Sequence, residues 1–169
     1  LGQFEYAPVA VVGLGFEQAT LGTDLNGFGF LVPGEEQRRI LGSLWTSSIF
    51  AHRAPDGCVL LRTLIGGARN PSLALLPEAQ LVEMARAELR DILGISASPV
   101  FVQVFQWPRA ICQYTVGHRE RLQQVDARLS SLPGLFITGN SYRGVSLNDC
   151  TQNAVQVADA QSNSLAAPP

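Results

Sequence analysis

The residues best suited to chemistry lie near the carboxyl end of the chain, where a short apolar run leads into a glycine-containing loop and a helix. The run covers residues 135–138, the loop covers residues 139–144, and the helix is expected to begin at Val145. The first N–H groups of a helix have no partner within it, and the helix dipole adds positive charge there. Such a site favours phosphate, carboxylate or the negative charge of a reduced flavin ring. An ordinary strand-to-helix connection has the same spacing, so this pattern leaves both interpretations open.

The glycines of this loop do not form a recognised nucleotide fingerprint. Gly139 and Gly144 would let the backbone approach a ligand closely. The chain contains neither GxGxxG nor GxxxxGK[ST], so a nucleotide site built from this sequence alone is not supported.

Residues for acid–base or nucleophilic catalysis are scarce. His52 precedes a turn and His118 lies at an expected helix start, so each is interpreted as a surface or capping residue. Glu35 and Glu36 are expected to be solvated, and Asp149 is expected to serve the first turn of its helix. No GxSxG sequence is present to form a nucleophile elbow. We therefore assign no catalytic residue, which fits a cofactor-dependent enzyme and a non-catalytic binding module equally well.

The three cysteines give no sign of a metal site or a disulfide framework. Cys58, Cys112 and Cys150 are far apart and odd in number, and no CxxC motif is present. We interpret them as reduced thiols of a cytoplasmic protein and assign no metal ligand.

Composition excludes several partners. A net charge of -2 without a basic run gives no electrostatic argument for nucleic acid. No stretch reaches the ~18–20 apolar residues of a spanning helix. The charged fraction of 15% is low for a fully exposed surface, which indicates area hidden on a partner domain, a ligand or a membrane surface. The chain starts without Met and without a charged lead-in, so we expect it to begin inside a longer reading frame and not at a signal peptide.

Strands and helices must position the loop described above. Short apolar runs bounded by Gly and Pro predict strands, and apolar residues at helical spacing predict helices. Strands are expected at residues 6–16, 28–32, 40–50, 59–65, 100–107 and 135–138, and helices at residues 77–94, at 118–132 and from Val145. The helix from Val145 is expected to bury a face that includes Leu147, Cys150 and Ala154. The fold class is α+β, or mixed α/β, with a sheet first and a strand-loop-helix at the end.

Several segments, taken in order, resemble one known family. They are GFGFLVP at 27–33, SSIF at 47–50 before RAPDG at 53–57, IGGARNP at 65–71, Trp107, AICQY at 110–114 with GH at 117–118, and GLFITGNSYRGVSLNDC at 134–150. Together they resemble the carboxy-terminal portion of the protoporphyrinogen and coproporphyrinogen oxidases, within the flavoprotein superfamily of the monoamine oxidases. That family usually has Pro where this chain has Cys112.

The resemblance implies a division of the chain and a cofactor. Residues 1–133 would belong to a substrate-binding domain, and residues 134–169 would complete an FAD domain whose amino-terminal Rossmann-type half is absent here. FAD contacts would fall on Trp107, Val145, Ser146 and Leu147, and Phe28 would pack on the tetrapyrrole substrate or, alternatively, in the core of the sheet. We do not expect this chain alone to hold FAD.

The implied activity is the six-electron oxidation of a porphyrinogen to a porphyrin in haem biosynthesis, with molecular oxygen as acceptor. A related flavin amine oxidase or carotenoid desaturase is the alternative enzyme, and a non-catalytic fragment that acts as a binding module is the alternative of another class. The choice between the two porphyrinogens, a homodimer and peripheral attachment to a membrane are left open.

Overall fold

The computed structural model describes the backbone of residues 1–166 and the side chains of residues 1–162. The chain forms two compact units. The sheet unit is Ala7–Ala110, and the helical unit combines Leu1–Tyr6 with Ile111–Pro169. The boundaries between these two units differ from the predicted division of the chain into residues 1–133 and residues 134–169. That division concerns substrate and flavin domains, and it stays a prediction.

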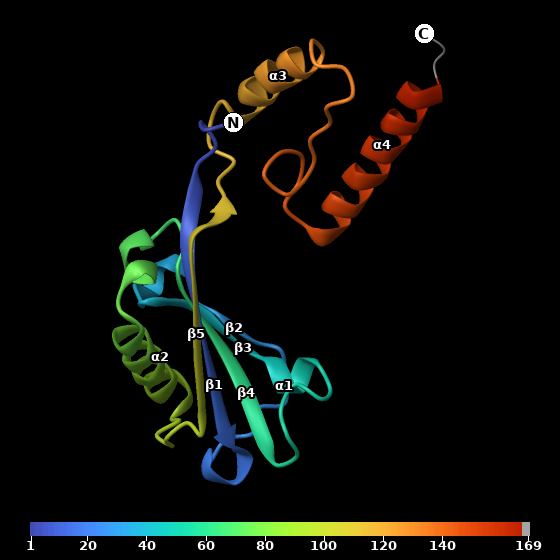
Figure 1. Ribbon diagram of the computed structural model, residues 1–169. Coiled ribbons are helices and arrows are strands. Elements are labelled where there is room, and N and C mark those ends of the chain that lie inside the picture. Colours follow the sequence, from blue (N-terminus) through green and yellow to red (C-terminus); the bar gives the residue numbers. More distant parts are fainter. Residues whose placement is uncertain (167–169) are drawn as a thin grey trace. The chain divides into compact units, whose positions relative to one another are not determined.

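One antiparallel sheet organises the first half of the chain (Figure 1). Its strand order is β2-β3-β4-β1-β5. Backbone bonds from Val100 N–H to Gly15 O and from Gln113 N–H to Glu5 O show that β5 runs antiparallel to β1. The strands are β1 (Tyr6–Glu17), β2 (Gly29–Leu31), β3 (Ile40–Trp45), β4 (Cys58–Gly66) and β5 (Phe101–Cys112). The five predicted strands of this half are therefore confirmed, but two of them end elsewhere than predicted. β3 stops at Trp45, where the single helical turn α1 (Thr46–Ile49) begins, and β5 continues past the predicted end at Trp107 to Cys112.

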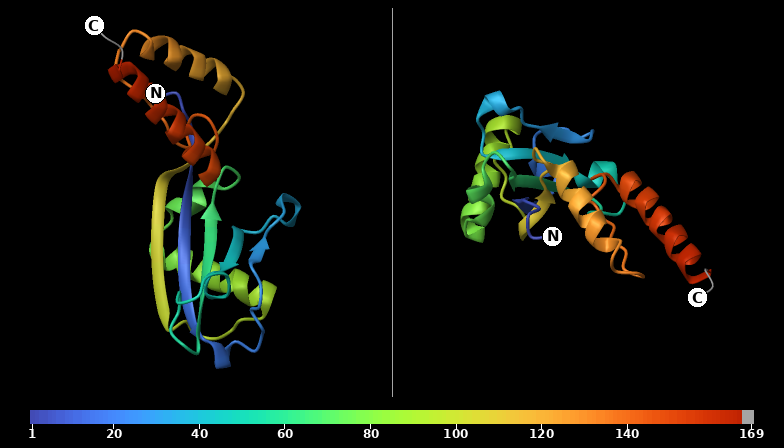
Figure 2. Two further views of the ribbon diagram at one scale, coloured as in Figure 1. Left: turned by 90° about the vertical axis from the view of Figure 1, so that its right-hand side faces the viewer. Right: turned by 90° about the horizontal axis from the view of Figure 1, so that it is seen from above.

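One face of the sheet is covered by a helical layer. Figures 1 and 2 show α2 (Glu78–Leu93) lying along this face. Period-two alternation sends the apolar side chains of β1 and β4 to this face, where they meet the apolar stripe of α2. The buried core includes Val12, Leu14, Phe16, Leu61, Ile65, Leu81, Ala85 and Leu89. The short 3₁₀ turns are η1 (Gln18–Thr20), η2 (Gly34–Glu36) and η3 (Pro71–Leu75).

A buried carboxylate ties the β2–β3 connection to α2. Glu88 is only 5% exposed. Its carboxylate accepts hydrogen bonds from Arg38 Nη1 at 3.1 Å and from the backbone N–H of Arg39 at 3.3 Å, and Arg39 Nε lies 3.5 Å away. A buried carboxylate requires such partners, because its desolvation is otherwise uncompensated. The contact therefore fixes the connection that follows β2.

The helical unit contains α3 (His118–Leu129) and α4 (Leu147–Ala166). Both were predicted, with α3 ending three residues early. The predicted strand at 135–138 is wrong for this chain, because the segment is extended but pairs with no other strand among the described residues. A strand needs a neighbour to bond its N–H and C=O groups. The predicted burial of the α4 face is also wrong, since Leu147 is 82% exposed and Ala154 is exposed.

Candidate functional site

A tyrosine hydroxyl closes the loop that precedes α4. Tyr114 donates to the carbonyl oxygen of Asn140 and accepts from the N–H of Gly144, each at 2.8 Å. One hydroxyl thus joins both ends of the loop 140–144. Tyr114 carries no local sequence signal for this role, although it lies in the AICQY segment that contributed to the resemblance.

The middle of the same loop is held by residues distant in sequence. Tyr6 donates its hydroxyl hydrogen to Ser141 Oγ at 2.8 Å, and the Cys112 thiol lies 3.5 Å from the Ser141 carbonyl oxygen. His118 Nε2 lies 2.9 Å from the Tyr142 carbonyl oxygen. Since a carbonyl only accepts, this nitrogen carries the hydrogen. The loop is therefore supported along its whole length.

His118 is part of an aromatic cluster and not a surface residue, so the sequence interpretation was wrong on this point. Its ring stacks on Tyr114 with centroids 3.9 Å apart and meets the edge of Phe4 at 5.5 Å. Phe4 also packs edge-on against Tyr142. The cluster forms because Leu1–Tyr6 and the residues from Ile111 onward belong to the same compact unit. Their separation in the sequence gives no sign of this proximity.

The start of α4 is capped by its own side chains. Ser146 Oγ accepts the N–H of Asp149 at 3.0 Å, and the Asp149 carboxylate accepts the N–H of Ser146 at 3.2 Å. This reciprocal arrangement confirms that Asp149 serves the first helical turn. Gly144 is required beside it, because a Cβ on Gly144 would lie 2.5 Å from Asp149 Cβ and its φ is +124°.

The cap decides which ligand this helix start can take. Of the N–H groups without an intrahelical partner, those of Ser146 and Asp149 are satisfied, which leaves those of Leu147 and Asn148. The Asp149 carboxylate also offsets part of the positive helix dipole. A neutral or weakly charged carbonyl oxygen therefore fits better than the phosphate or carboxylate that the sequence alone allowed.

The second candidate surface is the uncovered face of the sheet, which we call the open face. Side chains that alternate away from the core reach it from four strands, and the single turn α1 lies beside it, where Thr46 accepts a hydrogen bond from Arg62. Gly13 and Gly15 of β1 place no side chain there. The open face comprises Leu44 of β3, Leu60, Arg62 and Leu64 of β4, Val11, Gly13 and Gly15 of β1, and Phe101, Gln103, Phe105 and Trp107 of β5.

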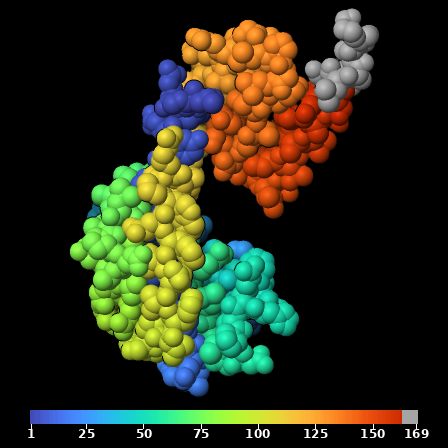
Figure 3. Space-filling model, in the orientation of Figure 1, coloured from blue at the N-terminus to red at the C-terminus, as the bar shows by residue number. Residues whose placement is uncertain are grey.

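Aromatic residues line one edge of the open face. Trp107 is 48% exposed and stacks on Phe105 with ring centroids 5.7 Å apart. In Figure 3 the residues of β5, drawn in yellow, form a continuous exposed strip. Exposed aromatic rings in such a row provide a flat apolar wall for a ligand.

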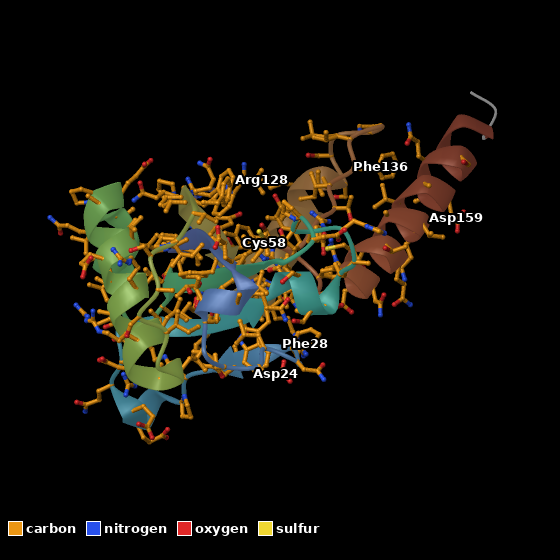
Figure 4. The ribbon with its side chains drawn as sticks, turned by 90° about the horizontal axis from the view of Figure 1, so that it is seen from below. Asp24, Phe28, Cys58, Arg128, Phe136 and Asp159 are labelled. Atoms are coloured by element: carbon orange, nitrogen blue, oxygen red, sulfur yellow. The ribbon has the colours of Figure 1, made fainter. Side chains whose placement is uncertain are left out.

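The sequence-predicted site residues fall in different places. Phe28 precedes β2 at one edge of the sheet, and Trp107 lies on β5 at the other, so three strands separate them. Phe28 is 69% exposed, which rules out the alternative of sheet core, and Figure 4 shows its side chain beside β2. Val145, Ser146 and Leu147 belong to the helical unit and are all exposed.

Other chemistry is limited in the part of the chain that the structure describes. Residues 1–166 contain no group of three or more His, Cys, Asp or Glu residues placed to hold a metal ion. The three cysteines are free, and burial raises the pKa of the Cys112 thiol. No helix among these residues is long and apolar enough to cross a membrane.

Comparison with known proteins defines the class. The sequence profile described as "Flavin containing amine oxidoreductase" matches residues 1–160, so the chain belongs to this flavin-containing family. Within it the chain is similar to the porphyrinogen oxidases. It is 39% identical to the chloroplastic protoporphyrinogen oxidase of Nicotiana tabacum over 94% of this chain and 31% of that protein.

Two further comparisons agree. The coproporphyrinogen III oxidase of Bacillus subtilis is 32% identical over 90% of this chain and 33% of that protein. A crystal structure from Exiguobacterium sp. 255-15, provisionally named protoporphyrinogen oxidase, superposes with a TM-score of 0.79 at 26% identity, covering 96% of this chain and 36% of that one. The resemblance seen in the sequence and the mixed α/β fold class are confirmed. The chain spans about a third of the length of these relatives.

Proposed function

We propose that this chain forms the substrate-facing and flavin-contacting portion of an oxygen-dependent oxidase that contains FAD and converts a porphyrinogen to a porphyrin. The open face of the sheet is the observation that supports it most. A broad apolar surface edged by Phe105 and Trp107 suits a large ring system, which needs apolar walls more than polar contacts. Relatives named for protoporphyrinogen and for coproporphyrinogen are both similar to this chain, so the proposed substrate class is porphyrinogens.

The start of α4 supports a contact with one edge of a flavin. The free N–H groups of Leu147 and Asn148 would donate to a carbonyl oxygen on the flavin's pyrimidine edge. Trp107, which belongs to the sheet unit, is a separate proposed contact of the flavin. When bound, the flavin supplies the acceptor for the electrons removed from the substrate, and molecular oxygen receives them in turn. Val145 and Ser146 would shape the approach to the helix start. The chain has no GxGxxG sequence, so these residues provide only part of an FAD site.

The remaining FAD contacts would come from a Rossmann-type half outside these residues, which we propose as the main partner of this chain. The helical unit offers surface for it. A groove of about 450 Å³ is lined by residues of its amino-terminal segment, of α3 and of the segment after α3, among them the apolar Phe4, Val125 and Leu129. The outer face of α4 is exposed as well. A cytoplasmic location, peripheral membrane attachment and a homodimer stay predictions.

The test uses the full-length protein that contains these residues. The purified protein should be yellow with bound flavin, and it should convert protoporphyrinogen or coproporphyrinogen to the fluorescent porphyrin while consuming oxygen. A full-length protein without flavin absorbance would refute the proposal. The isolated chain should retain no FAD at stoichiometric level.

A pair of variants at one position tests the helix start. Leu147→Pro removes the N–H proposed to donate to the flavin, while proline is tolerated at the first helical position. Leu147→Ala keeps that N–H and is the matched control. We expect Leu147→Pro to weaken flavin binding about tenfold and Leu147→Ala to leave it unchanged. Equal flavin affinity in both variants would show that this N–H does not contact the cofactor.

A further inference from the structure

An arginine lies near the middle of the open face, where its direct neighbours are leucines and a glycine. Arg62 of β4 is opposite Gly13 of β1 on one side and Leu44 of β3 on the other. Its neighbours two residues away on the same face are Leu60 and Leu64. A cation in an apolar surface of this kind is expected to serve a charged partner, because apolar surroundings solvate it poorly.

The Arg62 side chain is held at its Nε atom, where the aliphatic part joins the guanidinium. Its Nε donates to Thr46 Oγ1 at 2.9 Å, and Thr46 is only 4% exposed. This bond uses one of the five N–H donors of the guanidinium and leaves the terminal amino groups for another acceptor. Arg62 is an exposed residue, and it forms no ion pair with an acidic side chain among residues 1–162.

Space for a ligand exists beside it. Gly13, the cross-strand neighbour of Arg62, has no side chain, and a Cβ placed there would meet nothing closer than the Gln103 carbonyl oxygen at 3.5 Å. A flat ring could therefore lie against the backbone of β1 while a substituent reaches the guanidinium.

We propose that Arg62 binds a carboxylate side chain of the porphyrinogen while the ring lies on the open face. This inference rests on the proposed function and adds the recognition of the substrate's acidic arms. Porphyrinogens of both named classes are apolar macrocycles with propionate side chains, so the largely apolar face and the Arg62 guanidinium match the two parts of the molecule. The planar fork of arginine pairs with a carboxylate through two parallel hydrogen bonds, which an ammonium group cannot do.

The experiment measures binding of protoporphyrin and of its dimethyl ester to the full-length, flavin-loaded protein by fluorescence. The wild type should bind the free acid about tenfold more tightly than the ester. Arg62→Met should lose most of this preference, and Arg62→Lys should lose part of it. Arg90→Gln, on the helix that covers the opposite face of the sheet, should keep the preference and is the matched control.

Each outcome decides the inference. Equal affinity of the wild type for acid and ester, or an Arg62→Met variant that keeps the wild-type preference, would overturn it. Equal weakening of acid and ester in Arg62→Met would also overturn it, because the arginine would then act only by supporting the strand and Thr46. In turnover, Arg62→Met should raise KM for porphyrinogen and leave kcat nearly unchanged. A wild type that oxidises no porphyrinogen would refute the proposed function itself, whereas unchanged kinetics in Arg62→Met would refute only the role of Arg62.

Discussion

Replacing Tyr114 by Phe removes one oxygen atom and with it both hydrogen bonds that close the loop 140–144. The bonds join the hydroxyl to the Asn140 carbonyl and to the Gly144 N–H, each at 2.8 Å. The ring stack on His118 does not involve the hydroxyl, so it should persist. The substitution therefore tests the loop closure and little else.

The magnitude follows from the two bonds and their exposure. A net contribution of about 0.5–1.5 kcal/mol is usual for one hydrogen bond. Tyr114 is 43% exposed, so water can replace part of each bond and the lower half of this range applies. The loop should lose about 1–2 kcal/mol of closing free energy, which corresponds to roughly a 5- to 30-fold change in its opening equilibrium.

Amide hydrogen exchange measures this directly. In the full-length protein the Gly144 amide should exchange about 5- to 30-fold faster in Tyr114→Phe than in the wild type, because its acceptor is gone. Tyr142→Phe is the control, since it removes a hydroxyl from the same aromatic cluster and touches neither bond. Unchanged exchange at Gly144 in Tyr114→Phe, or the same acceleration in Tyr142→Phe, would refute the loop-closing role of Tyr114.

Two further predictions concern packing and ionisation. Gly66→Ala should destabilise the fold by about 2–4 kcal/mol in chemical denaturation, because φ is +104° and the new Cβ would lie 2.5 Å from Ala74 Cβ. Gly22→Ala is the control, since φ is +67° there but no atom lies within 4 Å of the new Cβ, and it should lower the free energy of unfolding by only about 1 kcal/mol. Equal losses in the two variants would contradict the packing argument. Burial raises the pKa of the Cys112 thiol above its ordinary 9.0, so the folded state keeps this proton where the unfolded state releases it, and the free energy of unfolding should fall as pH rises above about 9. Alkylation of the folded protein should accordingly modify the half-buried Cys58 before Cys112, and the reverse order would refute the burial argument.

Local sequence predicted most of the secondary structure. The helix α2 was bounded correctly because Pro77 precedes it and Gly94, with φ of +72°, caps its end. The apolar runs between glycines and prolines became the five strands. The segment 135–138 failed for a physical reason, since its composition is that of a strand but pairing depends on a neighbour that this part of the chain does not supply.

The site was less accessible to sequence reasoning. Asp149 was correctly assigned to the first helical turn, because a cap involves residues only three positions apart. His118 was misjudged, because its partners Phe4 and Tyr142 are far away in sequence. Arg62 was not singled out from the sequence, because only the alternation of the finished sheet places it on the open face.

The sequence by itself determined the family, the order of the elements and the capped start of α4, because these depend on ordered motifs and on contacts between near neighbours. Tertiary structure decided the rest. Antiparallel pairing of β1 with β4 and β5 created the open face and set Trp107 and Arg62 on it. Return of the amino-terminal residues to the helical unit brought Tyr6 and Phe4 to the loop before α4. Both arrangements join residues that are far apart in the sequence, and such pairs come together only when the fold closes.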